Sequence, residues 1–233
     1  MLLVFCLIVA LVSWIDAGWA CLLPKEWGKP IKREALLSPD RRTLAWAETI
    51  SKLDPATDLG KLFVRDEKTA QVDTVFAARA TSAGKIIWHD GKVRQENVHV
   101  FCDIDWSWDS RYLIIDELIS HTNSDVFENY YWIYDRAQKS RSKIDTKYLN
   151  RLVTENLRSR GLLTQASWGL IVTGWERAKS YRVVFASYPY HSPDQTLPTT
   201  LWTTAPTGSE PKLLSDKKDS FEQKLFGHVV PAP

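Results

Sequence analysis

Cysteine, methionine and glycine are all scarce in this sequence of 233 residues, which has three, one and ten of them respectively. The three cysteines include no Cys-x-x-Cys pair, and the histidines show no His-x-His spacing, so no zinc-binding pattern is present. The few glycines form no Gly-rich loop able to cradle a phosphate group. We therefore expect neither a metal ion nor another cofactor.

An excess of either charge is also missing, because 30 Lys and Arg balance 28 Asp and Glu to give a net charge of +2. So weak a bias gives no electrostatic reason to expect nucleic acid as a partner. With 44% hydrophobic and 25% charged residues, the composition excludes a disordered tail, a multi-span membrane protein and a collagen-like fibre.

The one long apolar run extends from Leu2 to Ile15 and is interrupted only by Ser13. It is shorter than the ~20 residues that a helix needs to cross a bilayer. We interpret residues 1–20 as a secretory signal peptide, although no Lys or Arg precedes the apolar run. The prediction is an exported protein whose mature part, residues 21–233, forms a single domain.

Cys21 has two interpretations. It follows Ala20 at the expected cleavage junction, which resembles the lipoprotein signal of bacteria, where the new N-terminal Cys carries a lipid. In that case Cys21 would tether the protein to a membrane. Because Cys6 lies in the signal peptide, only Cys21 and Cys102 would remain after cleavage, and in an oxidising compartment they can instead form a disulfide.

The sequence repeats with a period of about seventy residues. At a shift of 69, residues 38–46 align with residues 107–115, and residues 62–66 align with residues 131–135. A fixed period indicates one supersecondary unit that is used repeatedly, each copy burying a face against the next.

A third copy appears at a shift of 70. It places residues 181–185 on the strand that begins at Tyr112, and it places Leu201 and Trp202 on Tyr131 and Trp132. The units then comprise approximately residues 31–98, 99–166 and 167–233.

Each unit is predicted to form antiparallel strands. Residues 43–50 and 112–119 are short and rich in β-branched and aromatic residues, and each segment follows a Ser/Asp/Arg cluster suited to a tight turn. In these turns Asp40 and Asp109 can accept hydrogen bonds from backbone N–H groups two residues later. Polar linkers, residues 51–60 and 120–129, are expected before the second strands.

The pattern Ser-Pro-Asp, two polar residues, a Leu-containing strand and then an aromatic-rich strand ending in Asp resembles the repeat of TolB-like and WD40-like β-propellers. The resemblance covers residues 38–66 and 107–135, with Arg41 and Ser110 where the family has Gly. It implies a mainly β fold with antiparallel sheets in propeller-like repeat units, forming an open or partial propeller or a sandwich.

One or two short helices are expected beside the sheets. Apolar residues between Lys147 and Arg160 recur at helical spacing, and Gly161 stands where a glycine ends a helix. Residues 220–223 have the spacing of a capping box, with Gly227 as the stop.

The most polar cluster is residues 103–109, in which oxygen-bearing side chains occupy every odd position. That spacing can surround Ca²⁺, but Trp108 and Ile114 stand where an EF-hand loop requires Gly and Glu. We therefore interpret the segment as a strand, with Ile104, Trp106 and Trp108 facing inward and the carboxylates facing water or a neighbouring turn.

Two further carboxylate pairs are candidates for acid/base chemistry. Asp116 and Glu117 are adjacent on a strand and so should point to opposite faces, whereas Asp40 and Asp109 come from separate units and can line a cleft. Glu48 recurs as Glu117, which predicts a structural hydrogen bond in each unit.

Aromatic residues supply the candidate binding surface, because Trp and Tyr concentrate interface energy. Residues 188–193 are expected to form an exposed recognition loop. The predicted binding residues are Tyr188, Tyr190, His191 and Trp108.

The resemblance implies an exported bacterial cell-envelope protein that acts as a non-enzymatic protein-binding module. One version is an inhibitor or immunity-type protein that buries the active site of a toxin or hydrolase. The alternative is a periplasmic carboxylate-dependent hydrolase, using Asp40 and Asp109, or a carbohydrate-binding protein. A cleft holding two carboxylates ~5–10 Å apart would favour the hydrolase, and a flat aromatic patch would favour protein binding.

Overall fold

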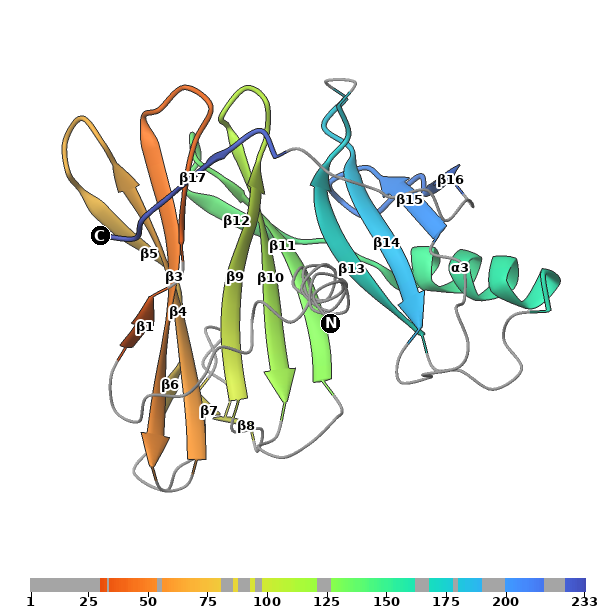
Figure 1. The fold of residues 1–233 in the computed structure, drawn as a ribbon, viewed down its shortest axis with the longest axis horizontal. Coiled ribbons are helices and arrows are strands. Elements are labelled where there is room, and N and C mark those ends of the chain that lie inside the picture. Colours follow the sequence, from red (N-terminus) through yellow and green to blue (C-terminus); the bar gives the residue numbers. More distant parts are fainter. Residues whose placement is uncertain are drawn as a thin grey trace, which may run out of the picture.

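The computed structural model describes residues 30–32, 34–53, 56–80, 86–87, 93–94, 98–120, 127–161, 168–177, 180–189, 200–215 and 225–233. The predicted signal peptide, Cys21, Tyr190 and His191 lie outside these ranges. Within them the chain consists mainly of antiparallel strands, accompanied by one helix (Figure 1). No helix in the described ranges combines the length and the apolar character needed to cross a membrane.

The strands form three successive units of four antiparallel strands each. The first unit consists of β2 (Ala35–Leu37), β3 (Thr43–Leu53), β4 (Ala56–Asp66) and β5 (Val72–Ala77). The second consists of β9 (Val98–Trp106), β10 (Tyr112–Ser120), β11 (Phe127–Asp135) and β12 (Ser140–Lys143). The third consists of β13 (Trp168–Trp175), β14 (Val183–Pro189), β15 (Thr200–Thr204) and β16 (Lys212–Ser215).

Short strands complete the fold. They are β1 (Pro30–Lys32), which pairs with β3; β6 (Arg79–Ala80), β7 (Ile86–Ile87) and β8 (Val93–Arg94), which form a small sheet; and β17 (His228–Val230), which pairs with β2. A short parallel pairing near the N-terminal ends of β4 and β9 joins the first two units into one sheet.

The register of the central hairpins confirms the repeat. Equivalent cross-strand pairs are Trp46 with Phe63, Ile115 with Trp132, and Phe185 with Trp202. The first two pairs are 69 residues apart and the last two are 70 apart, as the sequence comparison predicted. The three segments therefore adopt the same strand pairing at the same positions.

The units pack face to face. One core cluster joins the first unit to the second, with Ala45, Leu62 and Phe76 on one side and Leu113 and Ile115 on the other. A second cluster joins the second unit to the third and includes Ile114, Tyr131, Phe185 and Trp202. Two consecutive residues of β10, Ile114 and Ile115, thus enter different cores, because successive side chains of a strand point to opposite faces.

Helix α3 (Lys147–Ser159) confirms the first predicted helix and follows β12. Its buried residues Leu149, Val153 and Leu157 share one face and enter the core between the second and third units. Gly161 has a φ of +69°, and its N–H donates to the carbonyl of Arg158, so it ends the helix as predicted. Residues 220–223 of the second predicted helix lie outside the described residues.

The predicted linker at residues 51–60 is wrong. Instead, β3 continues to Leu53 and β4 begins at Ala56, with Leu53 opposite Ala56 in an unbroken register. The polar composition of this stretch does not by itself distinguish a strand from a loop. In the second unit β10 ends at Ser120 and β11 begins at Phe127.

The strand predicted over residues 103–109 is correct only as far as Trp106, where β9 ends, because Trp108 and Asp109 lie in the turn before β10. The predicted outward direction of the carboxylates is also wrong at Asp105. The side chain of Asp105 is fully buried. In the pairing of β9 with β10, Ile114 lies opposite Asp105 and Ile115 lies opposite Asp103, so Ile104 is an extra residue in a β-bulge. The bulge interrupts the alternation of side chains.

A bulge at Ile104 also separates two residues that were expected on one face. Ile104 packs against the core between the second and third units, whereas Trp106 belongs to the core between the first and second units. A strictly alternating strand would have directed both side chains the same way.

Candidate functional site: the turn face

The first turn of each of the first two units has the same hydrogen-bond geometry. In the first unit the Ser38 hydroxyl donates to Asp40 Oδ1 at 2.6 Å, and the same oxygen accepts from the backbone N–H of Arg42 at 3.1 Å. The Ser38 hydroxyl oxygen also accepts from the N–H of Thr43 at 3.0 Å. These bonds fix the connection between β2 and β3.

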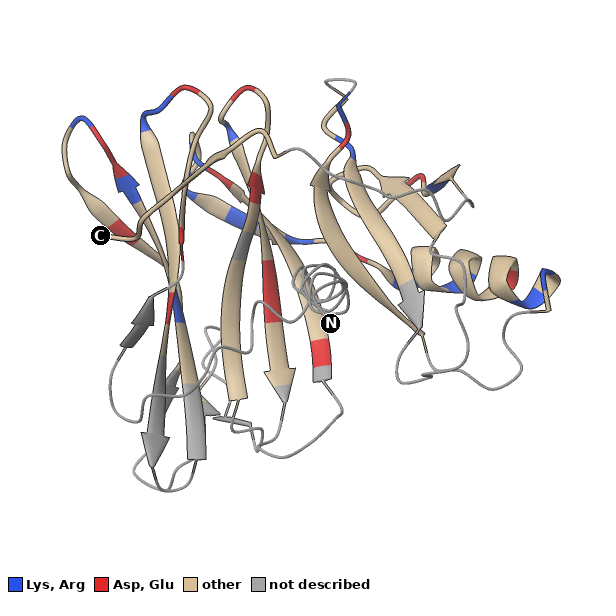
Figure 2. Cartoon of the chain, in the orientation of Figure 1, with Lys and Arg blue, Asp and Glu red and all other residues tan. Residues whose placement is uncertain are grey.

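The second unit repeats these contacts. The Ser107 hydroxyl donates to Asp109 Oδ1 at 2.7 Å, Asp109 accepts from the N–H of Arg111 at 3.2 Å, and Ser107 accepts from Tyr112 at 2.9 Å. The predicted turn-fixing role of both aspartates is confirmed. Figure 2 shows both acidic and basic residues along the turns at the upper ends of the strands. We name this end, which includes Asp40, Asp109 and Arg111, the turn face.

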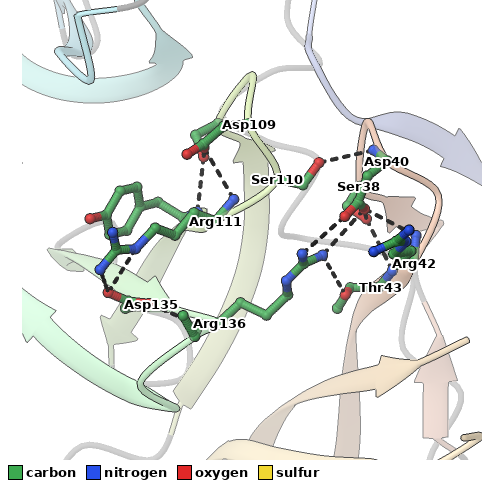
Figure 3. A network of polar contacts seen from close by, with 12 residues as sticks. Ser38, Asp40, Arg42, Thr43, Asp109, Ser110, Arg111, Asp135 and Arg136 are labelled. Carbon is green, nitrogen blue, oxygen red and sulfur yellow. Dashed lines mark hydrogen bonds and ion pairs between the residues drawn. The ribbon is translucent and has the colours of Figure 1, made fainter. Parts of the chain in front are cut away.

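Polar contacts also link the two turns to each other (Figure 3). The backbone N–H of Asp40 donates to the Ser110 hydroxyl at 2.9 Å. Arg136, which follows β11, places both terminal nitrogens on the Asp40 carboxylate, at 2.9 and 3.2 Å, and also donates to the Thr43 hydroxyl at 2.9 Å. A forked guanidinium–carboxylate contact of this kind fixes direction as well as distance. The turn face is therefore held rigidly across the first two units.

These contacts keep both turn carboxyls ionised. Partial burial opposes ionisation of Asp40, but hydrogen bonds from Arg136, Ser38 and Arg42 outweigh it and lower its pKa to about 2. Partial burial also opposes ionisation of Asp109, yet bonds from Ser107, Tyr181 and Arg111 hold its pKa below the ordinary value. A hydrolase pair requires one carboxyl that stays protonated to act as the acid, and neither of these is suited to that role.

An aromatic cluster lies beside Asp109, at the junction between the second and third units. The Trp108 ring stacks on the Tyr181 ring, with centroids 5.7 Å apart, and Tyr112 meets Tyr181 edge-on at 5.5 Å. The Arg111 guanidinium lies 4.9 Å from the centre of the Tyr112 ring. We name Trp108, Arg111, Tyr112 and Tyr181 the turn-face cluster.

The polar ends of two members of the turn-face cluster, Tyr181 and Arg111, have fixed partners. The Tyr181 hydroxyl donates to Asp109 Oδ2 at 2.8 Å, and this bond raises the pKa of Tyr181. Arg111 donates through two nitrogens to Asp135 Oδ2, at 2.9 and 3.2 Å. The three aromatic residues are half-buried, and the Arg111 side chain is 43% exposed. The cluster is thus both preorganised and accessible.

Glu117 lies in the interior and not on the turn face. Its carboxylate meets His99 Nε2 at 2.6 Å and accepts from the Trp132 indole N–H at 2.7 Å, with Glu117 and His99 fully buried. Glu48 accepts from the Trp46 indole N–H at 3.1 Å. The predicted structural hydrogen bond is therefore confirmed in the first two units.

The third unit uses neutral groups at the same place. Ser187 occupies the position of Glu117 and shares a 2.5 Å hydrogen bond with the Thr200 hydroxyl, which also accepts from the Trp202 indole N–H at 2.9 Å.

As predicted, Asp116 and Glu117 point to opposite faces. Asp116 accepts from the Asn129 side-chain amide, away from the contacts of Glu117.

Of the predicted binding residues, Trp108 lies in the turn-face cluster. Tyr188 lies in β14, but its side chain is outside the described residues, as are Tyr190 and His191. Cys102 is disulfide-bonded, and because Cys21 is also outside the described residues, the Cys21–Cys102 pairing stays a prediction.

Sequence reasoning missed Tyr181 and Arg111 as members of the site. The available signal was their place beside the first turn of a repeat, since residues at equivalent turns gather at one end of packed units. The contact of Tyr181 with Trp108 depends on how the second and third units pack, which no local pattern encodes.

A cleft of about 430 Å³ lies elsewhere, between the second and third units and the start of α3. Its lining comprises Asn129, Tyr131, Thr146, Asn150, Trp168, Gly169 and Leu170. None of these residues carries a formal charge. Among the described residues, no three His, Cys, Asp or Glu side chains gather in a way that could hold a metal ion.

No protein-family model matches this chain, and no curated protein matches it. Among solved structures, it is similar to the β-propeller domain of the Trilobed protease from Pyrococcus furiosus, which is described as having an open velcro topology. The identity is 10% and the TM-score is 0.31, with 83% of this chain and 59% of that chain covered. This chain thus spans less than two thirds of that structure. Its own strand order and register define its propeller-like units.

Proposed function

We propose that this protein is a non-enzymatic protein-binding module and that the turn-face cluster is its contact surface. The observation that carries the proposal is the preorganised, accessible group of Trp108, Tyr181 and Arg111. Trp, Tyr and Arg are the residues most enriched at the energetic centres of protein interfaces.

Preorganisation supports binding because a partner need not immobilise these side chains. Tyr181 is already fixed by Asp109, and Arg111 by Asp135. Ordering a flexible side chain on association costs about 0.5–1.5 kcal/mol, so a surface ordered beforehand retains more of its contact energy. The aromatic rings supply apolar area, and the exposed Arg111 guanidinium suits a carbonyl or carboxylate group on the partner.

The finer version of the proposal is an exported bacterial envelope protein that inhibits a toxin or hydrolase. A preorganised surface can cover an active site without chemistry of its own. In support, the Asp40 and Asp109 carboxyls are committed to turns and held ionised, which leaves the rival hydrolase mechanism without an acid from that pair.

The test uses the mature full-length domain as bait in bacterial envelope extract, with Trp108→Ala and Arg111→Ala as site variants. Tyr148→Ala is the matched control, because Tyr148 is 47% exposed on α3 and pairs with Arg151 as Tyr112 pairs with Arg111. Circular dichroism first verifies that each variant is folded. A partner identified by mass spectrometry is then purified and its affinity for each variant is measured.

We expect the partner to bind the original chain and Tyr148→Ala alike. Loss of a central interface residue costs about 2 kcal/mol or more, so Trp108→Ala should weaken binding by at least roughly thirtyfold. Equal binding by all variants would place the interface elsewhere. Absence of any retained protein, together with turnover of a glycan or ester, would contradict the proposed function.

A second candidate function, binding of a neutral sugar, is favoured by the cleft at Trp168. Trp168 offers an aromatic face, while Asn129, Asn150 and Thr146 offer amide and hydroxyl groups, and the lining is uncharged. Its size suits a small ligand, since such sites occupy about 300–1,000 Å³. Calorimetric titration with neutral disaccharides, repeated on Trp168→Ala, tests this function. No heat of binding with the original chain would exclude it for the sugars used.

A further inference from the structure

The C-terminal residues 226–233, which we name the C-terminal latch, return to the first unit, and the end marked C in Figure 1 lies beside the strands of that unit. In this segment β17 pairs antiparallel with β2, placing Val230 opposite Ala35 and Val229 opposite Leu36. Val230 and Ala232 also pack against the apolar cluster that contains Trp46. The latch thus gives β2 a neighbour on the edge that does not face β3, and exposed strand edges are prone to pair with other chains.

A buried carboxyl group holds the start of the latch. Asp105 Oδ1 accepts from the backbone N–H groups of Phe226 and Gly227, at 3.0 and 3.1 Å. The side chain of Asp105 is fully buried, and its second oxygen, Oδ2, has no hydrogen-bond partner. Backbone N–H groups alone, without a positively charged partner, are a weak compensation for burying a full negative charge.

The fit around this contact is tight. A methyl group added at Gly227 would come within 2.7 Å of the Leu36 Cγ atom. The latch can therefore approach Asp105 this closely only because residue 227 has no side chain. With the latch in this position the Asp105 carboxyl group is fully buried.

We propose that closure of the C-terminal latch is coupled to protonation of Asp105. With the latch closed, Asp105 is dry and favours its neutral form. With the latch lifted, water reaches the carboxyl group, which then ionises as an ordinary aspartate does. Falling pH therefore closes the latch, and rising pH loosens it.

The direction follows from the two protonation equilibria. Burial raises the pKa of Asp105 to about 7, against the opposing effect of the bonds from Gly227 and Phe226. In the open form the carboxyl returns toward its ordinary pKa of 3.8. Between these two pKa values Asp105 is protonated in the closed form and ionised in the open form. The equilibrium constant for closure therefore falls by up to about tenfold for each unit of rising pH. Below about pH 4 and above about pH 7 the closure equilibrium no longer depends on pH.

Among the described residues, the ionisable groups beside the latch and Asp105 come from the latch itself, from the turn after β13 and from β10. On the latch itself His228 is exposed, and from the turn after β13 the Arg177 guanidinium lies 5.8 Å from the centre of the Phe226 ring. On β10 the nearby carboxylates are Asp116 and Glu117, which bond to Asn129 and to His99 and Trp132. The groups that act on the Asp105 carboxyl besides burial are backbone N–H groups.

The experiment is hydrogen exchange of the amides of residues 228–230 in the full chain, from pH 5 to pH 8, corrected for the intrinsic exchange rate. We expect protection to fall by about a hundredfold over this range in the original chain. Asp105→Asn keeps an acceptor oxygen and cannot ionise, so its protection should be independent of pH. His228→Gln is the matched control and should keep the original slope.

Three results would overturn the proposal: flat protection in the original chain, an unchanged slope in Asp105→Asn, or loss of the slope in His228→Gln. Should Asp105→Asn fail to fold, the carbon-13 shift of the Asp105 carboxyl in the original chain decides the matter. It must titrate near pH 7, and titration near pH 4 would reject the coupling.

Discussion

Trp106 donates its indole N–H to the backbone carbonyl of Leu36 at 2.9 Å and thereby joins the first strands of two successive units. Trp175 donates in the same way to the carbonyl of Asp105, at 3.2 Å. Donor and acceptor are each displaced by 69 residues between the two cases. The repeat therefore includes the contact between units as well as the hairpins within them.

Trp106→Phe should destabilise the protein by about 2 kcal/mol or more, because it leaves the buried Leu36 carbonyl without its donor and shrinks a core side chain. Urea denaturation measures the change. Trp46→Phe is the control, since the same atoms are removed but the lost acceptor, Glu48, is half-buried and can turn to water. Equal losses in the two variants would show that the interunit hydrogen bond adds nothing.

Glu117→Ala should cost about 3 kcal/mol or more, because it strips the fully buried His99 and the indole of Trp132 of an acceptor. Glu48→Ala removes the equivalent residue of the first unit and should cost about 1 kcal/mol or less, since Glu48 is only half-buried. Thermal unfolding of the two variants gives the comparison. A smaller loss at Glu117 than at Glu48 would contradict the ranking by burial.

Arg41→Gly should stabilise the protein by roughly 0.5–1 kcal/mol. Arg41 has a φ of +57°, a left-handed conformation that costs a residue with a side chain about 1 kcal/mol more than glycine. Ser110 is the equivalent residue, with a φ of +66°, but its hydroxyl accepts from the Asp40 N–H. Ser110→Gly should therefore raise the free energy of unfolding by less than Arg41→Gly does. Chemical denaturation measures both changes, and a larger increase for Ser110→Gly would refute this reasoning.

Asp40 should contribute to stability at neutral pH and lose that contribution in acid. Its pKa is about 2 in the folded protein and 3.8 in an unconstrained chain, so the contribution is complete above about pH 4 and disappears as the pH falls through about 2. Because the side chain is 29% exposed, we expect about 1 kcal/mol after solvent screening.

Urea titrations of the original chain and Asp40→Asn at pH 6 and pH 2 measure this contribution. The stability difference between the two proteins should shrink on acidification, because at pH 2 about half of the folded molecules carry a protonated, uncharged Asp40. A difference that stayed constant with pH would show that the ion pair with Arg136 is not what stabilises the turn.

The local sequence pattern alone determined much of the secondary structure of this protein. The repeated Ser-x-Asp turns, the strands that follow them, the register of the third copy and helix α3 could all be predicted, because turn chemistry and side-chain periodicity act over a few residues. Trp108 could be chosen as a binding residue because of its type, but its stacking on Tyr181 could not be foreseen.

Only the tertiary structure decided the burial of Asp105, the extension of β3 and β4 into the expected linker, and the position of the C-terminal latch. Burial of Asp105 depends on an extra residue at Ile104 in the pairing with β10, and on two amides more than 120 residues away in the chain. Such contacts arise when distant segments compete to fill a shared core. Their energies depend on the packed arrangement of the whole molecule, whereas a sequence pattern records only the preferences of neighbouring residues.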